Sequence, residues 1–189
     1  MAIRGPGGLR ESRGIVRAIT AQRLPRLSGP CCSTIGCYCS IPLMPEPEPY
    51  GTRALPELYK EWASTGMVAN IGTRLVEIKA GSLVLEGNMS EEAHGFPTSR
   101  GLIVHGGAIA TLADEALASV AFTLAEEGEA TATADLKVDY YRPCKPGRLL
   151  ARATVRHRTK RLAFCEARVE QEDGVLVAEA RALIAYVKA

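Results

Sequence analysis

The sequence predicts an α+β fold in which one buried helix packs against an antiparallel sheet. The first observation is an alanine-rich helical pattern over residues 106–126, whose few charges indicate a helix surrounded by other elements. The second is a series of alternating apolar and polar runs after residue 128, the pattern of strands that bury one face. The third is that tight turns separate these runs, and strands joined by tight turns pair antiparallel.

The elements before the long helix follow from local patterns. A short helix is expected over residues 55–66, where apolar side chains recur with helical spacing. Two strands are expected between Val68 and Met89, separated by a turn at residues 80–82. Residues 90–101 are polar and contain glycine and proline, which predicts a loop.

The long helix over residues 106–126 comes next, and four strands are expected to follow it. Their ranges are 131–141, 149–157, 163–171 and 175–187. The turn Glu172-Asp173-Gly174 connects the last two runs and is the strongest hairpin signal in the sequence. The predicted order is therefore a pair of strands, one long helix and a group of four strands.

Composition divides the chain into a basic head and a mildly acidic body. The 189 residues carry a formal net charge of +2, whereas residues 1–43 contain six arginines and one glutamate and hold a charge of +5. We expect residues 1–43 to be a disordered extension, residues 44–54 an extended Pro-Glu linker, and residues 55–189 the folded domain. No apolar run of about eighteen residues is present, so no membrane span is expected. Near-neutral charge and 5% aromatic residues speak against nucleic-acid binding.

Three interpretations of the head stay open. The first is an organelle transit peptide, because the head is rich in arginine and poor in acids. The second is a translation start placed too far upstream, with Met44 as the true initiator. The third interpretation is a metal site at Cys31, Cys32, Cys37 and Cys39, which is the weakest because no second pair of Cys or His follows nearby. We therefore predict no metal. The expected location is the cytoplasm, or the mitochondrial matrix for a genuine transit peptide.

The segment from Gly101 to Ala116 carries the candidate site. Gly106 and Gly107 leave backbone N–H groups unshielded at the start of the long helix, where the helix dipole favours an oxyanion or a polarised carbonyl. Asp114 lies two turns further on nearly the same face, and a carboxylate in an apolar helix is costly without a partner or a task. The alternative is a structural helix start with a solvated carboxylate.

The spacing along this helix indicates a dimer. Seven residues with a rise of about 1.5 Å each separate Gly107 from Asp114 by roughly 10 Å, so one carbonyl group cannot contact both on one helix. The pair would have to come from two antiparallel copies of the helix. A two-fold axis then gives each dimer two equivalent sites.

Residues 101–114 read Gly-x-x-x-His-Gly-Gly-x-x-x-x-Leu-x-Asp, and residues 133–143 continue with Thr-Ala-Asp-Leu-Lys-Val-Asp-Tyr-Tyr-Arg-Pro before a Pro-Gly at 146–147. This combination resembles the hotdog-fold acyl-CoA thioesterases, in particular their PaaI-like branch, and the resemblance covers about residues 55–187. It implies a sheet wrapped around one central helix and the hydrolysis of an acyl-CoA thioester without a cofactor. It also implies a homodimer, with a homotetramer as the further expectation, since relatives often pair dimers.

The resemblance implies a role for each matching catalytic residue. Gly107 would supply the backbone N–H that polarises the thioester carbonyl. Asp114 would act as the nucleophile or as the general base that activates water. His105 would order the loop and help to hold the substrate, and Thr133 would position the water. Without the resemblance, His105 has the alternative of capping the helix start by hydrogen bonding.

Further residues are expected to contact the substrate. Gly106 lies beside the polarising amide, and Ser99 occupies the position where many relatives carry Asn six residues before the His. A basic run after residue 155 offers cations for the phosphates of CoA. Its candidate contacts are Arg156, Arg158, Lys160 and Arg161. The alternative for this run is a solvated strand end and turn.

Glu115 is an alternative to Asp114 as the catalytic carboxylate, and two other functions compete with hydrolysis. Glu115 adjoins Asp114, but its side chain leaves the helix about 100° away. One competing function is a hotdog hydratase or dehydratase, which pairs a His with a carboxylate for proton abstraction. The other is a non-catalytic acyl-CoA binding or sensor module. The Gly-Gly pair after His105 and the presence of Asp114 favour hydrolysis over both.

Overall fold

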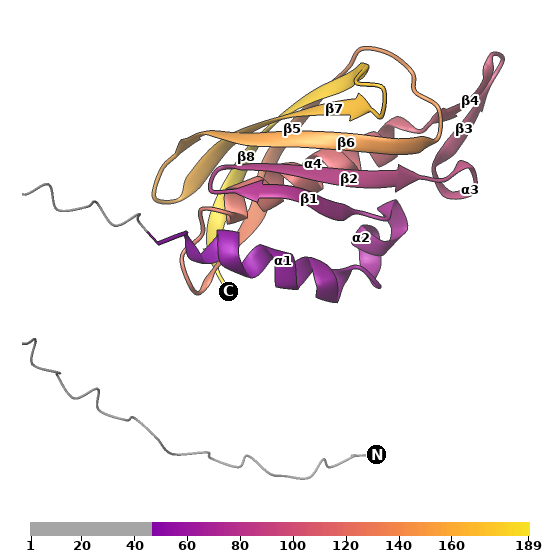
Figure 1. Cartoon of the computed structure of the whole chain (residues 1–189). Helices are drawn as coiled ribbons and strands as arrows, with labels where there is room; N and C mark the ends of the chain where they lie inside the picture. Colours follow the sequence, from indigo (N-terminus) through magenta and orange to yellow (C-terminus); the bar gives the residue numbers. More distant parts are fainter. Residues whose placement is uncertain (1–46) are drawn as a thin grey trace, which may run out of the picture. The chain divides into compact units, whose positions relative to one another are not determined.

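The computed structural model describes residues 47–189 and confirms the α+β fold. Its main sheet has six strands in the order β1-β2-β6-β7-β8-β5 (Figure 1). The strands are β1 Arg74–Lys79, β2 Ser82–Met89, β5 Glu129–Tyr140, β6 Gly147–Arg158, β7 Leu162–Gln171 and β8 Leu176–Lys188. Every neighbouring pair is antiparallel, including β2–β6 and β5–β8, which no tight turn connects. The head, including its four cysteines, lies outside the described residues.

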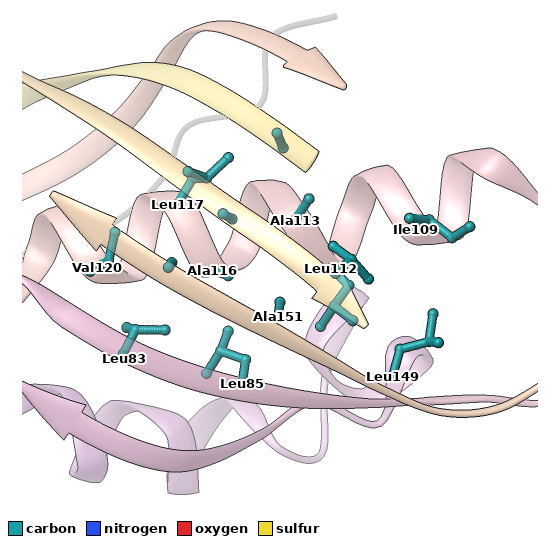
Figure 2. Packing of buried hydrophobic residues seen from close by; sticks show 14 of the residues in the cluster. Leu83, Leu85, Ile109, Leu112, Ala113, Ala116, Leu117, Val120, Leu149 and Ala151 are labelled. Carbon is teal, nitrogen blue, oxygen red and sulfur yellow. The ribbon is translucent and has the colours of Figure 1, made fainter. Parts of the chain in front are cut away.

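Helix α4 (Gly106–Phe122) is the buried central helix that the alanine-rich pattern predicts. It packs against β2, β5, β6, β7 and β8, and the sheet wraps around it (Figure 1). Leu112 and Leu117 of this helix have no exposed surface, and each contributes about 1.5–3 kcal/mol by leaving water. They belong to one cluster of buried hydrophobic residues with Leu83 and Leu85 of β2 (Figure 2).

Alanines on the helix and on the sheet bring the two layers close together. Ala113 and Ala116 of α4 have no exposed surface, and neither do Ala151, Ala163 and Ala178 of the strands. A single methyl group on each side leaves no room for a larger side chain, because protein interiors are close-packed. Enlarging one of these residues is expected to cost about 1–3 kcal/mol of stability. The alanine content therefore sets the distance between α4 and the sheet.

Helix α1 (Tyr50–Trp62) begins five residues before the predicted start, so residues 50–54 are helical and do not belong to a linker. It also ends before residue 66, where the next helix starts. The early start has a tertiary cause, because the first turn of α1 docks on the end of α4. The backbone N–H of Gly51 donates to the carbonyl of Ala125 at 3.1 Å.

A second bond and a steric requirement hold this docking site together. Thr52 Oγ1 donates to the carbonyl oxygen of Thr123 at 2.8 Å, and both threonines are buried. A Cβ atom on Gly51 would lie 1.6 Å from the carbonyl oxygen of Phe122. Only glycine therefore allows the two helices to approach this closely.

Two further segments differ from the prediction. Helix α2 (Gly66–Ile71) replaces the expected start of the first strand at Val68, and Gly72 ends this helix in the left-handed conformation with φ 62°. Residues 90–101, predicted as a loop, contain helix α3 (Glu91–His94) and the outer part of a hairpin. This hairpin consists of β3 (Gly95–Thr98) and β4 (Gly101–Val104), and it projects beyond the main sheet (Figure 1). None of the helices within residues 47–189 is long and apolar enough to cross a lipid bilayer.

Candidate active site

His105 caps the start of α4. Its Nδ1 accepts a hydrogen bond from the backbone N–H of Gly107 at 2.9 Å, which confirms the capping alternative. A backbone N–H can only donate, so Nδ1 is the unprotonated nitrogen and the neutral ring carries its proton on Nε2. The ring also makes an edge-on contact with Phe96 of β3, with 5.9 Å between the ring centroids. His105 therefore offers an N–H donor on the side away from the cap.

The cap decides which amide is free at the helix start. The N–H of Gly107, expected to polarise a carbonyl, already has His105 as its acceptor. The N–H of Gly106, one residue earlier, has no acceptor among residues 47–189. It sits at the positive end of the helix dipole, where an added acceptor is favoured. The geometry thus favours Gly106 over Gly107 as the donor to a bound carbonyl oxygen.

Tyr140 of β5 holds the first peptide of α4 in place. Its hydroxyl donates to the carbonyl oxygen of Gly106 at 2.9 Å, and its ring carbons would lie 3.5 Å from a Cβ atom on Gly106. Burial raises the pKa of Tyr140, so the hydroxyl keeps its proton at neutral pH. The sequence signal for Tyr140 is the alternation Leu136, Val138, Tyr140, which places the three side chains on one face of a strand.

Asp114 and Thr133 meet further along α4. Asp114 Oδ1 accepts a hydrogen bond from Thr133 Oγ1 at 2.7 Å, so the structure brings together two residues that the sequence separates by 19 positions. Asp114 is half-buried and Thr133 is exposed, which leaves one side of the pair open. The hydroxyl fixes the direction of the carboxylate without covering it.

A bulge in β5 lies next to Thr133. It explains why side chains on both sides of the bulge point toward α4 and the core. Before the bulge, Thr131 and Thr133 face the helix, and Thr131 Oγ1 donates to the carbonyl oxygen of Ala118 at 3.2 Å. After the bulge, Leu136 and Val138 pack against the core. One extra residue shifts the alternation by one position, as bulges beside functional sites commonly do.

Glu115 is held in a different environment from Asp114. Its Oε2 accepts a hydrogen bond from Thr73 Oγ1 at 2.9 Å, and its Oε1 is buried with no partner among the described residues. Burial raises the pKa of Glu115, and the charge of Asp114 adds to this effect. The rival carboxylate therefore bonds to Thr73 and not to Thr133.

The two halves of the candidate site are separate within one protomer. Gly106 and Asp114 are eight residues apart on α4, which places them about 12 Å apart along the helix axis. Ser99 is also distant, because it lies at the tip of the β3–β4 hairpin, roughly 10 Å of strand away from His105. One protomer thus brings Asp114 to Thr133 but does not bring Ser99 to either half of the site.

His94 supports the loop that enters α4. It is buried, and its carbonyl oxygen accepts the N–H of His105 at 2.7 Å. Its Nδ1 accepts the N–H of Ser90 at 2.9 Å, which leaves the Nε2 proton for Asn70 Oδ1 at 3.2 Å. Asn70 and His105 lie on elements other than that of His94, whereas Ser90 caps the same short helix α3. His94 therefore fixes the position of His105 through the hydrogen bond between their backbones.

The four basic candidate residues separate into two groups. Arg158, Lys160 and Arg161 line a cavity of about 570 Å³, which we call the basic hollow. Arg158 pairs with Glu129 at 3.1 Å and lies over the ring of Tyr186, 4.4 Å from its centroid. Tyr186 in turn donates to the carbonyl oxygen of Ala121, so the basic hollow lies at the C-terminal end of α4.

Arg156 does not belong to the basic hollow. It pairs with Glu166 at 3.3 Å in a separate groove, which is also lined by Asp135 and Lys137. Its charge is therefore already balanced by a neighbouring carboxylate. The structure keeps Arg158, Lys160 and Arg161 together and leaves Arg156 apart from them.

A family comparison covers the central part of this site. Residues 102–178 match the model of a family described as the thioesterase superfamily. The matched segment includes Gly106, Asp114 and Thr133, and it runs from β4 into β8. No curated protein matches the chain in a sequence search.

Solved structures share the fold of residues 47–189. The PaaI protein of the phenylacetic acid degradation operon of E. coli is 20% identical with a TM-score of 0.62, over 72% of this chain and 95% of that protein. A thioesterase family protein from Silicibacter pomeroyi is 23% identical with a TM-score of 0.62, over 71% and 98% of the two chains. A further protein of the thioesterase superfamily reaches 29% identity and a TM-score of 0.62, over 73% and 98%. The hotdog fold that the sequence resemblance implies is thereby confirmed.

Proposed function

We propose that the folded domain hydrolyses acyl-CoA thioesters, with Asp114 as general base or nucleophile. The observation that carries the proposal is the 2.7 Å hydrogen bond from Thr133 to Asp114 on the open side of α4. Because Thr133 donates to Oδ1, the second oxygen of the carboxylate is left to face a water molecule or a thioester carbon. The lone pairs of the Thr133 hydroxyl can accept a hydrogen bond from that water.

The reaction then follows from the positions of these groups. The N–H of Gly106 would donate to the thioester oxygen and stabilise the charge that develops there, an effect worth about 2.7–4 kcal/mol for one such donor. As a base, Asp114 takes a proton from water while the water oxygen bonds to the carbonyl carbon. The carbon–sulfur bond then breaks, the CoA sulfur takes up the proton that Asp114 holds, and the free acid and CoA leave. As a nucleophile, the Asp114 carboxylate would attack the carbonyl carbon and expel CoA, and water would then hydrolyse the mixed anhydride to the free acid and Asp114.

His105 fits a supporting role better than a base. Its neutral ring carries the proton on Nε2, because Nδ1 is used by the helix cap. The Nε2–H can donate to the bound thioester but cannot remove a proton from carbon. This tautomer favours hydrolysis over the hydratase alternative, which needs a basic His.

The proposal requires two copies of the domain. Gly106 and Asp114 of one helix are about 12 Å apart, so an antiparallel pair of α4 helices is needed to bring one of each to the same carbonyl. Strand β5 supports this pairing, because it is an edge strand of the main sheet and its residues 132–135 are exposed. An exposed edge presents unpaired backbone groups that a second β5 would satisfy. We therefore propose a homodimer as the active unit, and a homotetramer stays an expectation.

The phosphates of CoA would bind in the basic hollow. Arg158, Lys160 and Arg161 converge there, and phosphate groups need such cations. The hollow lies about 10 Å beyond Asp114 along the axis of α4 and about 22 Å from Gly106. Arg156 is a weaker candidate because it lies outside the basic hollow, in a separate groove.

The proposal is tested by comparing Asp114→Asn with Glu115→Gln. Release of free thiol is measured with a panel of acyl-CoA substrates, and binding is measured with a non-hydrolysable acyl-CoA analogue. General-base catalysis contributes about 10²–10⁴-fold, so Asp114→Asn is expected to lose at least that much turnover and keep its binding. Glu115→Gln is expected to lose far less. A dead Glu115→Gln beside an active Asp114→Asn would identify the wrong carboxylate, and full activity of both would contradict the mechanism.

A further inference from the structure

An apolar cavity of about 470 Å³ lies between α1, α4 and β5, and we call it the apolar hollow. This volume falls in the range of small-molecule sites. Its walls include Leu58 and Trp62 of α1, Val68 of α2 and Phe122 of α4. Trp62 is 38% exposed, so the hollow leaves part of a large apolar side chain in contact with solvent. A ligand with an apolar surface would cover it.

The apolar hollow continues directly from Asp114 and Thr133. Ala118 lies one helical turn beyond Asp114, and Thr131 lies two residues before Thr133 on the same face of β5. Both residues line the hollow, and Thr131 donates to the carbonyl oxygen of Ala118 at 3.2 Å. A chain attached to a carbonyl carbon at Asp114 therefore enters the hollow within its first few carbons.

The charges around the apolar hollow restrict what it can hold. Of the described residues that line it, none is Lys, Arg or His, whereas Glu115 and Glu129 are acidic. Ser119 on its wall bonds to Tyr59 at 2.9 Å, and Glu115 Oε2 accepts a hydrogen bond from Thr73, while Glu115 Oε1 has no partner among the described residues. A carboxylate at the end of a bound chain would find no cation there. The walls thus suit a neutral hydrocarbon.

We propose that the apolar hollow binds the acyl group and that the substrates are acyl-CoAs with an uncharged hydrocarbon chain of several carbons. This inference rests on the proposed hydrolysis of acyl-CoA. Each buried methylene group improves binding about fourfold, so a longer chain gains more from the hollow than acetyl does. Ala118 would set the width of the entrance, and Trp62 would cover the chain from the side of α1.

The placement also gives the substrate a direction. A chain in the apolar hollow points toward the C-terminal end of α4, where the basic hollow of the same protomer lies. Because the acyl chain occupies the side toward the C-terminal end of α4, the CoA moiety would extend in the opposite direction, toward the N-terminal end of α4. Antiparallel pairing of two α4 helices places the basic hollow of the second copy on that side.

The inference is tested by measuring kcat/KM against chain length for acetyl-, hexanoyl- and dodecanoyl-CoA. Ala118→Leu narrows the entrance, and we expect a loss of about tenfold or more with dodecanoyl-CoA and little change with acetyl-CoA, because bound methylenes are displaced. Trp62→Ala removes a partly exposed apolar side chain from the wall of the hollow. We expect kcat/KM of this variant to rise less with chain length than that of the wild type. Met67→Ala is the matched control, since Met67 is exposed nearby and is not part of the hollow.

The outcomes separate this inference from the proposed function. If the wild-type protein hydrolyses no acyl-CoA, the proposed function fails and the inference fails with it. If it hydrolyses acyl-CoA but Ala118→Leu and Trp62→Ala keep the wild-type chain-length profile, only the acyl-binding role of the hollow is overturned. A uniform loss at all chain lengths, accompanied by dissociation in light scattering, also overturns that role and assigns the hollow to the contact between copies.

Discussion

Replacing Tyr140 by Phe removes one hydroxyl group and tests how the start of α4 is held. In the structure this hydroxyl donates to the carbonyl oxygen of Gly106 at 2.9 Å, while the ring packs on the same glycine. Phe keeps the ring, so only the hydrogen bond is lost. One such bond contributes about 1 kcal/mol, which corresponds to roughly fivefold in a rate or an equilibrium. Removing a whole oxyanion donor costs about 10²–10³-fold, so a donor that is merely less well oriented should cost less than that.

We therefore expect kcat of Tyr140→Phe to fall about five- to tenfold with KM nearly unchanged. The assay is thiol release from a saturating acyl-CoA, together with a thermal unfolding curve. Tyr186→Phe is the matched control, because Tyr186 also donates to a carbonyl of α4, that of Ala121, at 2.9 Å and at the opposite end of the helix.

Both variants are expected to lose a similar amount of stability, and only Tyr140→Phe is expected to lose kcat. A stability loss of about 1 kcal/mol lowers Tm by roughly 2–4 °C in a protein of this size. Equal kcat values for Tyr140→Phe and the wild type would refute the positioning role. Equal kcat losses in the two variants would show that a loosened helix, and not the orientation of Gly106, causes the effect.

The remaining predictions concern stability. Gly51→Ala would place a Cβ atom 1.6 Å from the carbonyl oxygen of Phe122, so α1 must shift, and we expect a loss of about 1–3 kcal/mol measured by denaturant unfolding. A chain starting at Met44 keeps α1 and should match the full chain in the same experiment, whereas instability of that chain would show that the head contributes to the fold. Burial raises the pKa of Glu115 in the folded protein above its ordinary value of 4.5. As the pH rises, the unfolded chain therefore loses the Glu115 proton at a lower pH than the folded protein does. The wild type loses stability over the pH range between these two pKa values. Glu115→Gln lacks this loss, so its Tm should gain on that of the wild type as the pH rises above 4.5, and parallel Tm curves would contradict the burial of an ionisable Glu115.

The secondary structure that could be predicted depends on patterns within one element. The alanine-rich run of α4 and the alternation in β5 to β8 are each contained in a single segment, so their period indicates both the type of element and its buried face. The start of α1 and the short elements that the sequence did not predict depend on contacts between segments. Residues 50–54 are helical because Gly51 and Thr52 bond to the end of α4, which lies about 70 positions away in the sequence.

The candidate site divides in the same way. The sequence by itself identified His105, the glycine pair and Asp114, because the helix start and its spacing are local features. The resemblance to known thioesterases added Thr133. Only the tertiary structure decided that the N–H of Gly107 is used by His105, that the N–H of Gly106 has no acceptor within residues 47–189, and that the Tyr140 hydroxyl donates to the carbonyl oxygen of Gly106. These are hydrogen bonds whose partners are chosen by distance and direction in space, and a sequence records neither quantity for residues on different elements.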